Sequence, residues 1–403
     1  MNVPKLRFKE FTDEWIAIKL NDISKTFDYG MNVASTSFDG KNKYIRITDI
    51  DDVSHKFLKN NIVSPSGSLE DKYLVRNDDI LFARTGASTG KTYLYNSNDG
   101  ILYFAGFLIR INVLKSYNSY FIFQNTLTKK YTDWVKVESI RSGQPGINAE
   151  QYKSYSIKCP TLAEQNKIAN FLSTVDKKIT NLENTITSLE NQKKGLLQQI
   201  FSQKLRFKDK NGNNYPNWEK KKLGDIGSFS RGGNLSKSDL SKKGTSCILY
   251  GELYTYYNEF ATEIKSKTLN TTNLVLSKKY DVLLPLSGET AEDISTCTCI
   301  FFDDIALGSD LLIFRSSFFD GRFMSLLLKY KYKYKIAQIA QGKSIVHISE
   351  KNIKNINIKI PCIEEQQNIA DFILIFTKKL ENQKAQLEHW KQIKKGLLQQ
   401  MFV

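Results

Sequence analysis

Two stretches of the chain have the hydrophobic spacing of long amphipathic helices. In each stretch, nine positions recur at alternating intervals of three and four residues, which is the spacing of a coiled-coil seam. Pro160 and Pro361 precede the two stretches, and proline favours extended chain before a helix begins. The pattern predicts helices over 160–202 and 361–403. The first seam is Leu172, Val175, Ile179, Leu182, Ile186, Leu189, Lys193, Leu196 and Ile200, and the second is Ile373, Phe376, Leu380, Gln383, Leu387, Trp390, Lys394, Leu397 and Met401.

The two predicted helices are copies of one sequence. Residues 160–201 and 361–402 align without gaps at an offset of 201, and 17 of the 42 positions are identical. A weaker match precedes each copy, because Lys-Leu-Arg-Phe-Lys occurs at 5–9 and again at 204–208. Self-similarity of this kind indicates an internal duplication. The chain therefore reads as globular segment, helix, globular segment, helix.

The duplication also predicts what the parts do. The helices are far better preserved than the globular segments, so we expect the helices to do one job twice and the globular segments to contact different targets. Matched seams can bury each other, so we expect the helices to pair antiparallel, with the globular domains at opposite ends. In the alternative arrangement each helix packs only on its own globular domain. The predicted boundaries are 1–159 and 203–360 for the globular domains and 160–202 and 361–403 for the helices.

The charge of the chain is concentrated in the globular segments. Among 403 residues, 58 Lys and Arg face 42 Asp and Glu, and 14 of the 16 excess positive charges lie in 1–160 and 203–361. A positive field there suits a nucleic-acid phosphate backbone, although an inert basic surface is the alternative. No apolar run is long enough to span a membrane. Five scattered cysteines suit a reducing compartment, so we expect a cytoplasmic protein.

A glycine-flanked loop is the first candidate binding motif. Gly86-Ala-Ser-Thr-Gly90-Lys91 resembles a phosphate-binding loop, but that motif needs four residues between its glycines and here there are three. The corresponding stretch at 287–290 has no lysine, so we exclude ATP binding. We expect instead a polar loop after a strand at 80–83 that contacts DNA, with an ordinary exposed hairpin as the alternative. The Arg84 guanidinium suits guanine, whereas the Lys343 ammonium suits phosphate.

Short polar turns recur later in both halves and form the second candidate contacts. They are Ser-Gly-Gln-Pro at 142–145 and Gln-Gly-Lys-Ser at 341–344. The Lys-Tyr repeat at 329–335 lies within a segment that we expect to be a basic surface helix near DNA. The complete set of predicted DNA contacts is Arg84, Thr85, Ser88, Thr89, Lys91, Ser142 and Gln144 in the first half and Arg231, Ser287, Glu289, Thr290, Lys343 and Ser344 in the second.

Catalytic motifs do not emerge from the sequence. Cys297 and Cys299 have no neighbouring histidine or second cysteine pair, so they are better explained by strand packing than by zinc. The three histidines lack the spacing of a ligand pair. The chain has neither the Asn-Pro-Pro-Tyr type of motif that holds a target base nor a glycine fingerprint for a methyl donor. We therefore expect no catalytic residue, no bound metal and no cofactor in this chain.

The repeated motifs resemble the specificity subunits of type I restriction–modification systems. The resemblance lies in the order of segments, in Pro-x-x-x-Glu-Gln-x-x-Ile-Ala at 160–169 and 361–370, and in Lys-Lys-Gly-Leu-Leu-Gln-Gln-x-Phe at 193–201 and 394–402. The opening Pro-Lys-Leu-Arg-Phe and the Asp79-Ile-Leu stretch before Gly86 are also typical. The resemblance covers essentially the whole chain.

This resemblance implies an α/β (α+β) fold with two target-recognition domains built on twisted sheets and two long helices in an antiparallel coiled coil. Each domain would read one half of a bipartite site in double-stranded DNA, and the helices would set the spacer between the halves. Two methyltransferase subunits and the restriction subunits would be the partners. AdoMet, ATP and Mg²⁺ would belong to those partners.

Two other classes of function remain open from the sequence. A divergent methyltransferase with its own recognition domain would bind AdoMet without partners. A non-catalytic coiled-coil scaffold would bind nucleic acid with an affinity that does not depend on base sequence at fixed salt.

Overall fold

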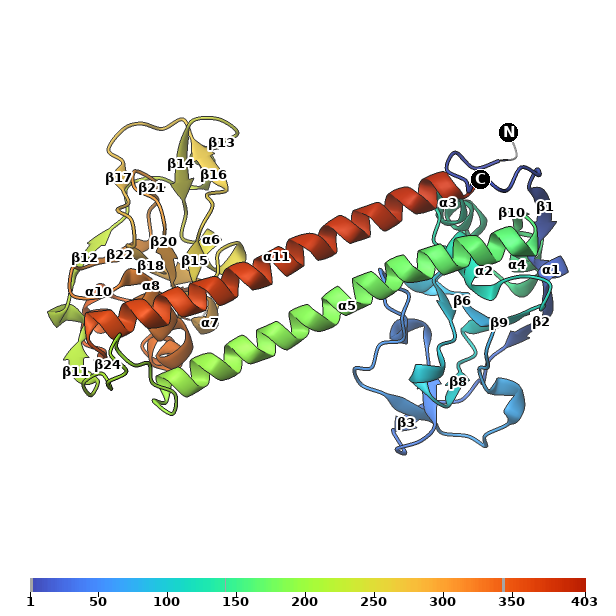
Figure 1. Cartoon of the computed structure of the whole chain (residues 1–403), viewed down its shortest axis with the longest axis horizontal. Helices are drawn as coiled ribbons and strands as arrows, with labels where there is room; N and C mark the ends of the chain where they lie inside the picture. Colours follow the sequence, from blue (N-terminus) through green and yellow to red (C-terminus); the bar gives the residue numbers. More distant parts are fainter. Residues whose placement is uncertain (1–2, 142, 343–344) are drawn as a thin grey trace. The chain divides into compact units, whose positions relative to one another are not determined.

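The computed structural model describes residues 3–141, 143–342 and 345–403. The chain forms two compact units (Figure 1). Unit 1 comprises residues 1–183 and 385–403, and unit 2 comprises residues 184–384. Both units combine helices with β-sheets, so the predicted α/β (α+β) fold class is confirmed.

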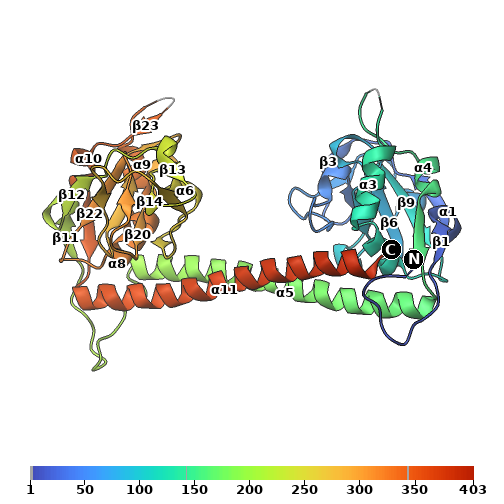
Figure 2. The ribbon, with the colours of Figure 1, turned by 90° about the horizontal axis from the view of Figure 1, so that it is seen from above.

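Unit 1 is built around one central strand, β6 (Asp79–Ala83), all of whose residues are buried. Ile80 and Phe82 pack with the helices of the unit, whereas Leu81 and Ala83 pack with a second layer of strands. Because successive side chains of a strand point to opposite faces, a strand covered on both faces reads as a continuous hydrophobic run. Figure 2 shows α3 beside the sheet that contains β6 and β9.

The four-stranded sheet of unit 1 is antiparallel, in the order β2, β9, β6, β7. Its other strands are β2 (Ser24–Tyr29), β9 (Leu108–Val113) and β7 (Thr92–Leu94). Three smaller pairs join β1 (Ile16–Lys19) with β10 (Ser156–Cys159), β3 (Ser35–Ser37) with β5 (Val63–Pro65), and β4 (Lys43–Ile45) with β8 (Leu102–Phe104). The short helices are α1 (Leu20–Ile23), α2 (Ser119–Asn125), α3 (Lys129–Glu138) and α4 (Ala149–Ser154).

Unit 2 repeats this plan with more strands. Its central strand β18 (Val282–Pro285) is also fully buried, with Val282 and Leu284 in one core and Leu283 in another. One five-stranded sheet has the order β12 (Ser228–Arg231), β22 (Leu311–Arg315), β18, β20 (Thr298–Ile300), β15 (Phe260–Ala261). The other has the order β13 (Leu240–Ser241), β16 (Ser266–Thr268), β14 (Thr245–Ile248), β21 (Ala306–Leu307), β17 (Val275–Leu276).

The remaining elements of unit 2 are short. Two strand pairs join β11 (Glu219–Lys222) with β24 (Asn357–Ile360) and β19 (Ser287–Gly288) with β23 (Val346–His347). The helices are α6 (Glu252–Thr255), α7 (Ala291–Ile294), α8 (Gly321–Leu326), α9 (Lys333–Gln338) and α10 (Glu350–Lys354), with a π-helical turn at Leu327–Lys331 between α8 and α9. Cys297 and Cys299 are buried in the core of unit 2, as expected for packing residues.

The two long helices predicted from the seam are α5 (Leu162–Phe201) and α11 (Ile363–Met401). In unit 1, Lys394 pairs with Asp176 at 2.8 Å, and Lys391 lies 3.9 Å from Glu183. In unit 2, Lys384 pairs with Glu190 at 2.6 Å. Residues late in α11 thus contact residues early in α5, and earlier residues of α11 contact later ones, which confirms the antiparallel pairing in each unit.

The seam of α5 is buried almost as predicted. The six hydrophobic positions from 172 to 189 and Ile200 are buried. Leu196 is half-buried, whereas its neighbour Leu197 is buried in the core of unit 2. In α11, Ile373, Leu380 and Met401 are buried, and the other predicted hydrophobic positions, Phe376, Leu387, Trp390 and Leu397, are half-buried. Near their ends the helices pack on a globular core as well as on each other, which moves the buried face by one residue.

The repeated motifs at the helix starts bind each other through ion pairs and have a structural role. Arg7 donates two hydrogen bonds of 2.8 Å to the Glu164 carboxylate, and the Trp15 indole donates to the same carboxylate at 3.3 Å. Arg206 likewise donates two hydrogen bonds to the Glu365 carboxylate, at 2.7 and 2.8 Å. Planar two-point pairing of this kind is the preferred geometry of arginine with a carboxylate. The Lys-Leu-Arg-Phe-Lys motif and the glutamate of each helix start are therefore preserved because they bind each other.

The glutamines beside these glutamates bind the backbone of their own unit. The Gln165 amide donates to the carbonyl of Pro160 at 2.9 Å and accepts from the backbone N–H of Asn118 at 3.0 Å. Gln366 donates to Pro361 and accepts from Asp320, both at 2.9 Å. The motif at the helix ends is used equally in both copies: Leu197, Ile200 and Phe201 enter the core of unit 2, and Leu398, Met401 and Phe402 enter the core of unit 1.

The two lysines of the predicted seams, Lys193 and Lys394, each form an ion pair with a carboxylate. Lys394 pairs with Asp176, which also accepts a 2.5 Å hydrogen bond from the Tyr120 hydroxyl. Lys193 pairs with the fully buried Glu259 of the second globular segment. Burial raises the pKa of Glu259, but the charge of Lys193 and its hydrogen bond outweigh burial, so this pKa lies below its ordinary value.

Candidate nucleic-acid interface

The two predicted loops of the first half lie side by side in unit 1. Thr85 forms a β-bridge with Gly146, and the backbone N–H of Gly86 donates to the Pro145 carbonyl at 2.9 Å. The Thr89 hydroxyl donates to the same carbonyl at 3.2 Å. The loop after β6 and the turn after α3, which the sequence predicted separately, thus form one surface.

Gly86 is required for this contact. Its φ of +71° lies in the left-handed region, and a Cβ at this position would lie 2.8 Å from the Gln144 amide nitrogen. Gln144 itself is exposed, as a residue that contacts DNA must be. Ser142 lies outside the described residues.

Arg84 is held in place without losing its donors. Its guanidinium carbon lies 4.9 Å from the centre of the Tyr29 ring, and Nη1 donates to the Gly106 carbonyl at a long 3.4 Å. The backbone N–H of Arg84 donates to the carbonyl of Phe107 at 3.0 Å. Tyr29 is 43% exposed and Phe107 is 59% exposed. We call Tyr29, Arg84 and Phe107 the Arg84 cluster; the sequence predicted only its arginine.

The remaining predicted DNA contacts of the first half differ in how far their side chains are already engaged within unit 1. Thr85, Ser88 and Thr89 are half-buried in the loop. Lys91 is tied to its own unit, because its ammonium pairs with Asp52 at 2.5 Å and donates to the Ile50 carbonyl at 3.1 Å. The sequence could not indicate this pair, since Asp52 is 39 positions away, and a DNA contact of Lys91 stays a prediction.

Unit 2 has the same arrangement at the same place. The loop after its central strand includes β19, which pairs with β23. The backbone N–H of Ile348 also donates to the Leu286 carbonyl at 3.1 Å. As in unit 1, the loop after the central strand joins the segment that follows the helices. Lys343 and Ser344 lie outside the described residues.

A polar recess of about 290 Å³ lies at this place in unit 2. The Ser287 hydroxyl is buried beside it, donates to Asp310 at 3.0 Å and lies 2.9 Å from Nδ1 of His347. Ser287 therefore holds Asp310 and His347 in place, and its role as a DNA contact stays a prediction. In a hydrolytic triad the imidazole lies between hydroxyl and carboxylate, whereas here the hydroxyl lies between the other two. The lining includes Arg231, Ser287, Asp310, Gln341, His347 and Asn352.

Arg231, Glu289 and Thr290, the other predicted contacts of unit 2 that the structure describes, are exposed. Thr290 caps α7, since its side chain accepts from the Asp293 N–H at 3.1 Å and donates to the Asp293 carboxylate at 2.7 Å. This capping box accounts for Thr290 without any ligand. Glu289 is exposed beside it.

Arg231 lies at the end of β12 and opens onto a second depression. This depression is about 580 Å³ and is also lined by Lys351 and Lys354 of α10. Sequence reasoning missed these two lysines, although α10 occupies the place that α4 has in the first half. Lys354 is partly engaged, because it pairs with Glu350 at 2.6 Å.

The Lys-Tyr repeat at 329–335 runs from the π-helical turn into α9 with a break at Tyr332, so the expected helix is interrupted. Its lysines serve unit 2 itself. Burial lowers the pKa of Lys329. Lys331 donates to the carbonyl of Phe201, and Lys333 pairs with Glu292 at 2.5 Å. A role of this segment near DNA stays a prediction.

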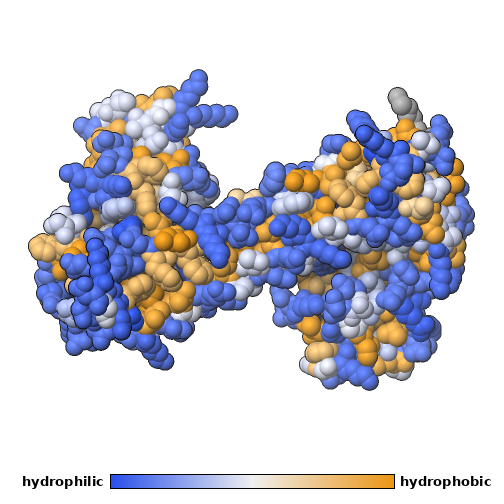
Figure 3. All heavy atoms as spheres, viewed as in Figure 1, coloured by the Kyte–Doolittle hydropathy of each residue, from blue (hydrophilic) through white to orange (hydrophobic). Residues whose placement is uncertain are grey.

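The surfaces of both units are mainly hydrophilic in the view of Figure 3, with scattered hydrophobic residues. Over residues 3–141, 143–342 and 345–403, no helix has the length and hydrophobicity needed to cross a membrane. The same part of the chain holds no group of three or more His, Cys, Asp or Glu residues placed to bind a metal ion.

Comparison with known proteins agrees with this geometry. Residues 12–191 and 215–389 match the family model described as the type I restriction modification DNA specificity domain. The chain is 23% identical over 363 residues to the specificity subunit of the type I restriction enzyme MjaVIII from Methanocaldococcus jannaschii, covering 86% of this chain and 83% of that protein.

Solved structures share the fold. The specificity subunit of a type I restriction–modification system from M. genitalium superposes with a TM-score of 0.63 at 16% identity, covering 100% of this chain and 99% of that one. A chain from a structure that describes complex assembly and conformational transition of the type I R-M system gives a TM-score of 0.55 at 14% identity. That match covers 95% of this chain and 96% of the other.

The duplicated architecture and the two matched segments place this chain in the type I restriction–modification DNA specificity family. The chain is a specificity subunit, the component of such a system that does not itself catalyse a reaction.

Proposed function

We propose that the globular domains, residues 1–159 and 203–360, each recognise one half of a bipartite site in double-stranded DNA. The observation that carries this proposal is that one topological site recurs in both units with different side chains. The loop after the central strand meets the segment after the helices in each unit, but Arg84 and Phe107 lie there in unit 1 and Arg231 and Asp310 in unit 2. Related folds with different surface chemistry suit the reading of two different base sequences.

The helices α5 and α11 set the spacing between the two half-sites in this proposal. Two methyltransferase subunits and the restriction subunits complete the complex in the cytoplasm, and AdoMet, ATP and Mg²⁺ act on those partners. The net positive charge of the globular domains supports DNA as the ligand, since neutralising phosphates supplies most of the non-specific affinity.

A binding measurement with the assembled complex tests the proposal. The site is first found by mapping N6-methyladenine in cells that contain or lack the chain. The chain, assembled with its methyltransferase partner, is then titrated on this site and on a scrambled duplex over a range of salt concentrations. We expect specific binding at least about 1,000-fold tighter than binding to scrambled DNA. Equal affinity for both duplexes would contradict the proposal and favour a non-specific scaffold.

A further inference from the structure

Phe107 is an exposed aromatic residue next to the backbone of Arg84. It lies in the turn between β8 and β9, with Gly106 before it and Leu108, the first residue of β9, after it. Single exposed hydrophobic residues are common on protein surfaces and need no explanation by themselves. Phe107, however, is joined by a backbone hydrogen bond to Arg84, the best candidate for base reading in unit 1. The backbone of an exposed phenylalanine therefore lies directly beside the backbone of Arg84.

The guanidinium of Arg84 is oriented but retains free donors. Its guanidinium carbon lies over the Tyr29 ring, and the bond to Gly106 uses only one of its five N–H groups. No other side-chain hydrogen bond of Arg84 occurs among the residues that the structure describes. The free edge suits the O6 and N7 acceptors of guanine in the major groove.

We propose that Phe107 reads the 5-methyl group of a thymine in the base pair next to the guanine that Arg84 contacts. This inference rests on the proposed DNA-recognition function and deepens it, because it names the chemical group that the first domain reads. Thymine alone among the four bases presents a methyl group in the major groove, and phenylalanine is one of the side chains that contacts it. Tyr29 acts as a positioning residue that holds Arg84.

Unit 2 offers different chemistry at the equivalent place. The residues before β22, which correspond to the turn before β9, are Ser309 and Asp310, and the strand corresponding to β2 ends in Arg231 instead of Tyr29. The described residues that line this site in unit 2 include no phenylalanine, tyrosine or tryptophan, and the imidazole of His347 lies 2.9 Å from the Ser287 hydroxyl. The thymine reading is expected in the first half-site only.

Replacing thymine by uracil tests the inference, because uracil pairs in the same way but lacks the methyl group. The chain, assembled with its methyltransferase partner, is titrated on its cognate duplex with uracil at each thymine position in turn. We expect one position in the first half-site to weaken binding about fourfold, the loss that follows from one buried methyl group. The Phe107→Ala variant should bind the thymine and uracil duplexes equally.

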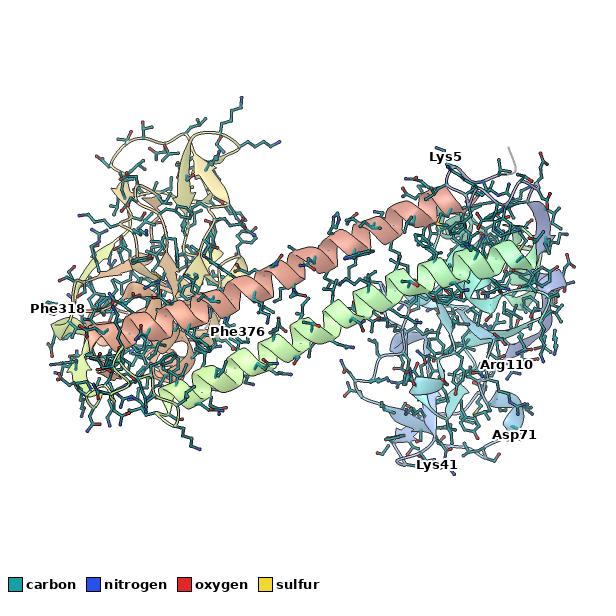
Figure 4. The ribbon with its side chains drawn as sticks, in the orientation of Figure 1. Lys5, Lys41, Asp71, Arg110, Phe318 and Phe376 are labelled. Atoms are coloured by element: carbon teal, nitrogen blue, oxygen red, sulfur yellow. The ribbon has the colours of Figure 1, made fainter. Side chains whose placement is uncertain are left out.

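Phe318→Ala is the matched control. Phe318 is 73% exposed and follows β22, at the opposite end of that strand from Asp310 (Figure 4). This variant should keep the full sensitivity to uracil. For Arg84, the Tyr29→Leu variant should lose discrimination at the guanine, and Tyr29→Phe should restore it because the ring face is retained.

The outcomes separate this inference from the function on which it rests. If the wild-type complex binds cognate and scrambled duplexes equally, DNA recognition itself fails. If it discriminates between them but no uracil weakens binding, or if Phe107→Ala keeps the sensitivity, only the methyl reading is wrong. A Phe107→Ala variant that loses affinity without any uracil effect would show a wedge between base steps instead, and that also overturns the methyl reading.

Discussion

Arg7 and Arg206 show why the best-preserved short motifs of this chain lie outside the reading loops. Each arginine binds the glutamate that the two helix starts share, and that glutamate is nearly or fully buried. A buried carboxylate without a partner is costly, so the arginine and the glutamate must be kept together. The side chains of the Arg84 cluster have no such constraint and are free to differ between the two halves.

Removing Arg206 should therefore destabilise unit 2. Arg206→Ala leaves the Glu365 carboxylate, which is 0% exposed, without its cation, and we expect a loss of about 3 kcal/mol in unfolding free energy. Thermal or urea unfolding of the purified chain measures it. Lys221→Ala, which breaks an exposed pair with Glu219, is the control and should change nothing measurable. A similar stability for both variants would contradict the structural role of the motif.

His55 predicts how stability depends on pH. Burial lowers the pKa of His55 in the folded chain, while in the unfolded chain it has the ordinary value of about 6.5. The unfolded state therefore binds the proton more readily, so stability is complete above about pH 6.5 and falls as the pH drops below it. Unfolding of wild type and His55→Asn at pH 7.5 and 5.5 measures the effect. His55 has a positive φ that asparagine tolerates, and the variant should lose part of the pH dependence.

At this scale the sequence predicts residue types better than partners. It indicated Arg84, because an arginine in a glycine-flanked polar loop suits a base edge. It could not indicate Tyr29, at the end of β2, or Phe107, in the turn before β9, because they join Arg84 only in the folded chain. For the same reason it could not pair Lys193 with Glu259, which is 66 positions away.

At the scale of elements, the long helices are predictable because their spacing persists over nine seam positions. Near the end of α5 the buried position shifts from Leu196 to Leu197, because Leu197 packs in the core of unit 2. The central strands are predictable for the same kind of reason. A run of hydrophobic residues such as Ile80–Ala83 indicates a strand that is buried on both faces. The short strand pairs at the edges have no comparable signal.

A charge in the seam should separate the helices. Leu182 is buried between α5 and α11, so Leu182→Asp places an unpaired carboxylate in an apolar contact, at a cost of several kcal/mol. We expect a clearly lower melting temperature, together with a changed small-angle scattering profile. Asn184→Asp adds the same charge at an exposed position of α5 and should behave as wild type. An unchanged profile and melting temperature in Leu182→Asp would contradict the helix pairing.

At the scale of the whole molecule, duplication is the main source of prediction. It indicates that the same site recurs in each half, and the structure brings the two predicted loops together in each unit. It does not indicate which side chains fill the site, because the globular segments have diverged. The fold and the location of the candidate interface were therefore accessible from the sequence, whereas its individual contacts were only partly accessible.

The modular arrangement of the two halves predicts that each domain acts alone on its half-site. Exchanging residues 10–158 for the matching segment of a related specificity subunit leaves α5, α11 and the whole second domain unchanged. The long helices α5 and α11, and ion pairs such as that of Arg206 with Glu365, are then the same in the hybrid as in the original chain. The most direct measurement is a genome-wide map of N6-methyladenine in cells carrying either the original chain or this hybrid. The account predicts that one half of the methylated motif changes while the other half and the spacer stay the same. A change in both halves, or in neither, would contradict it.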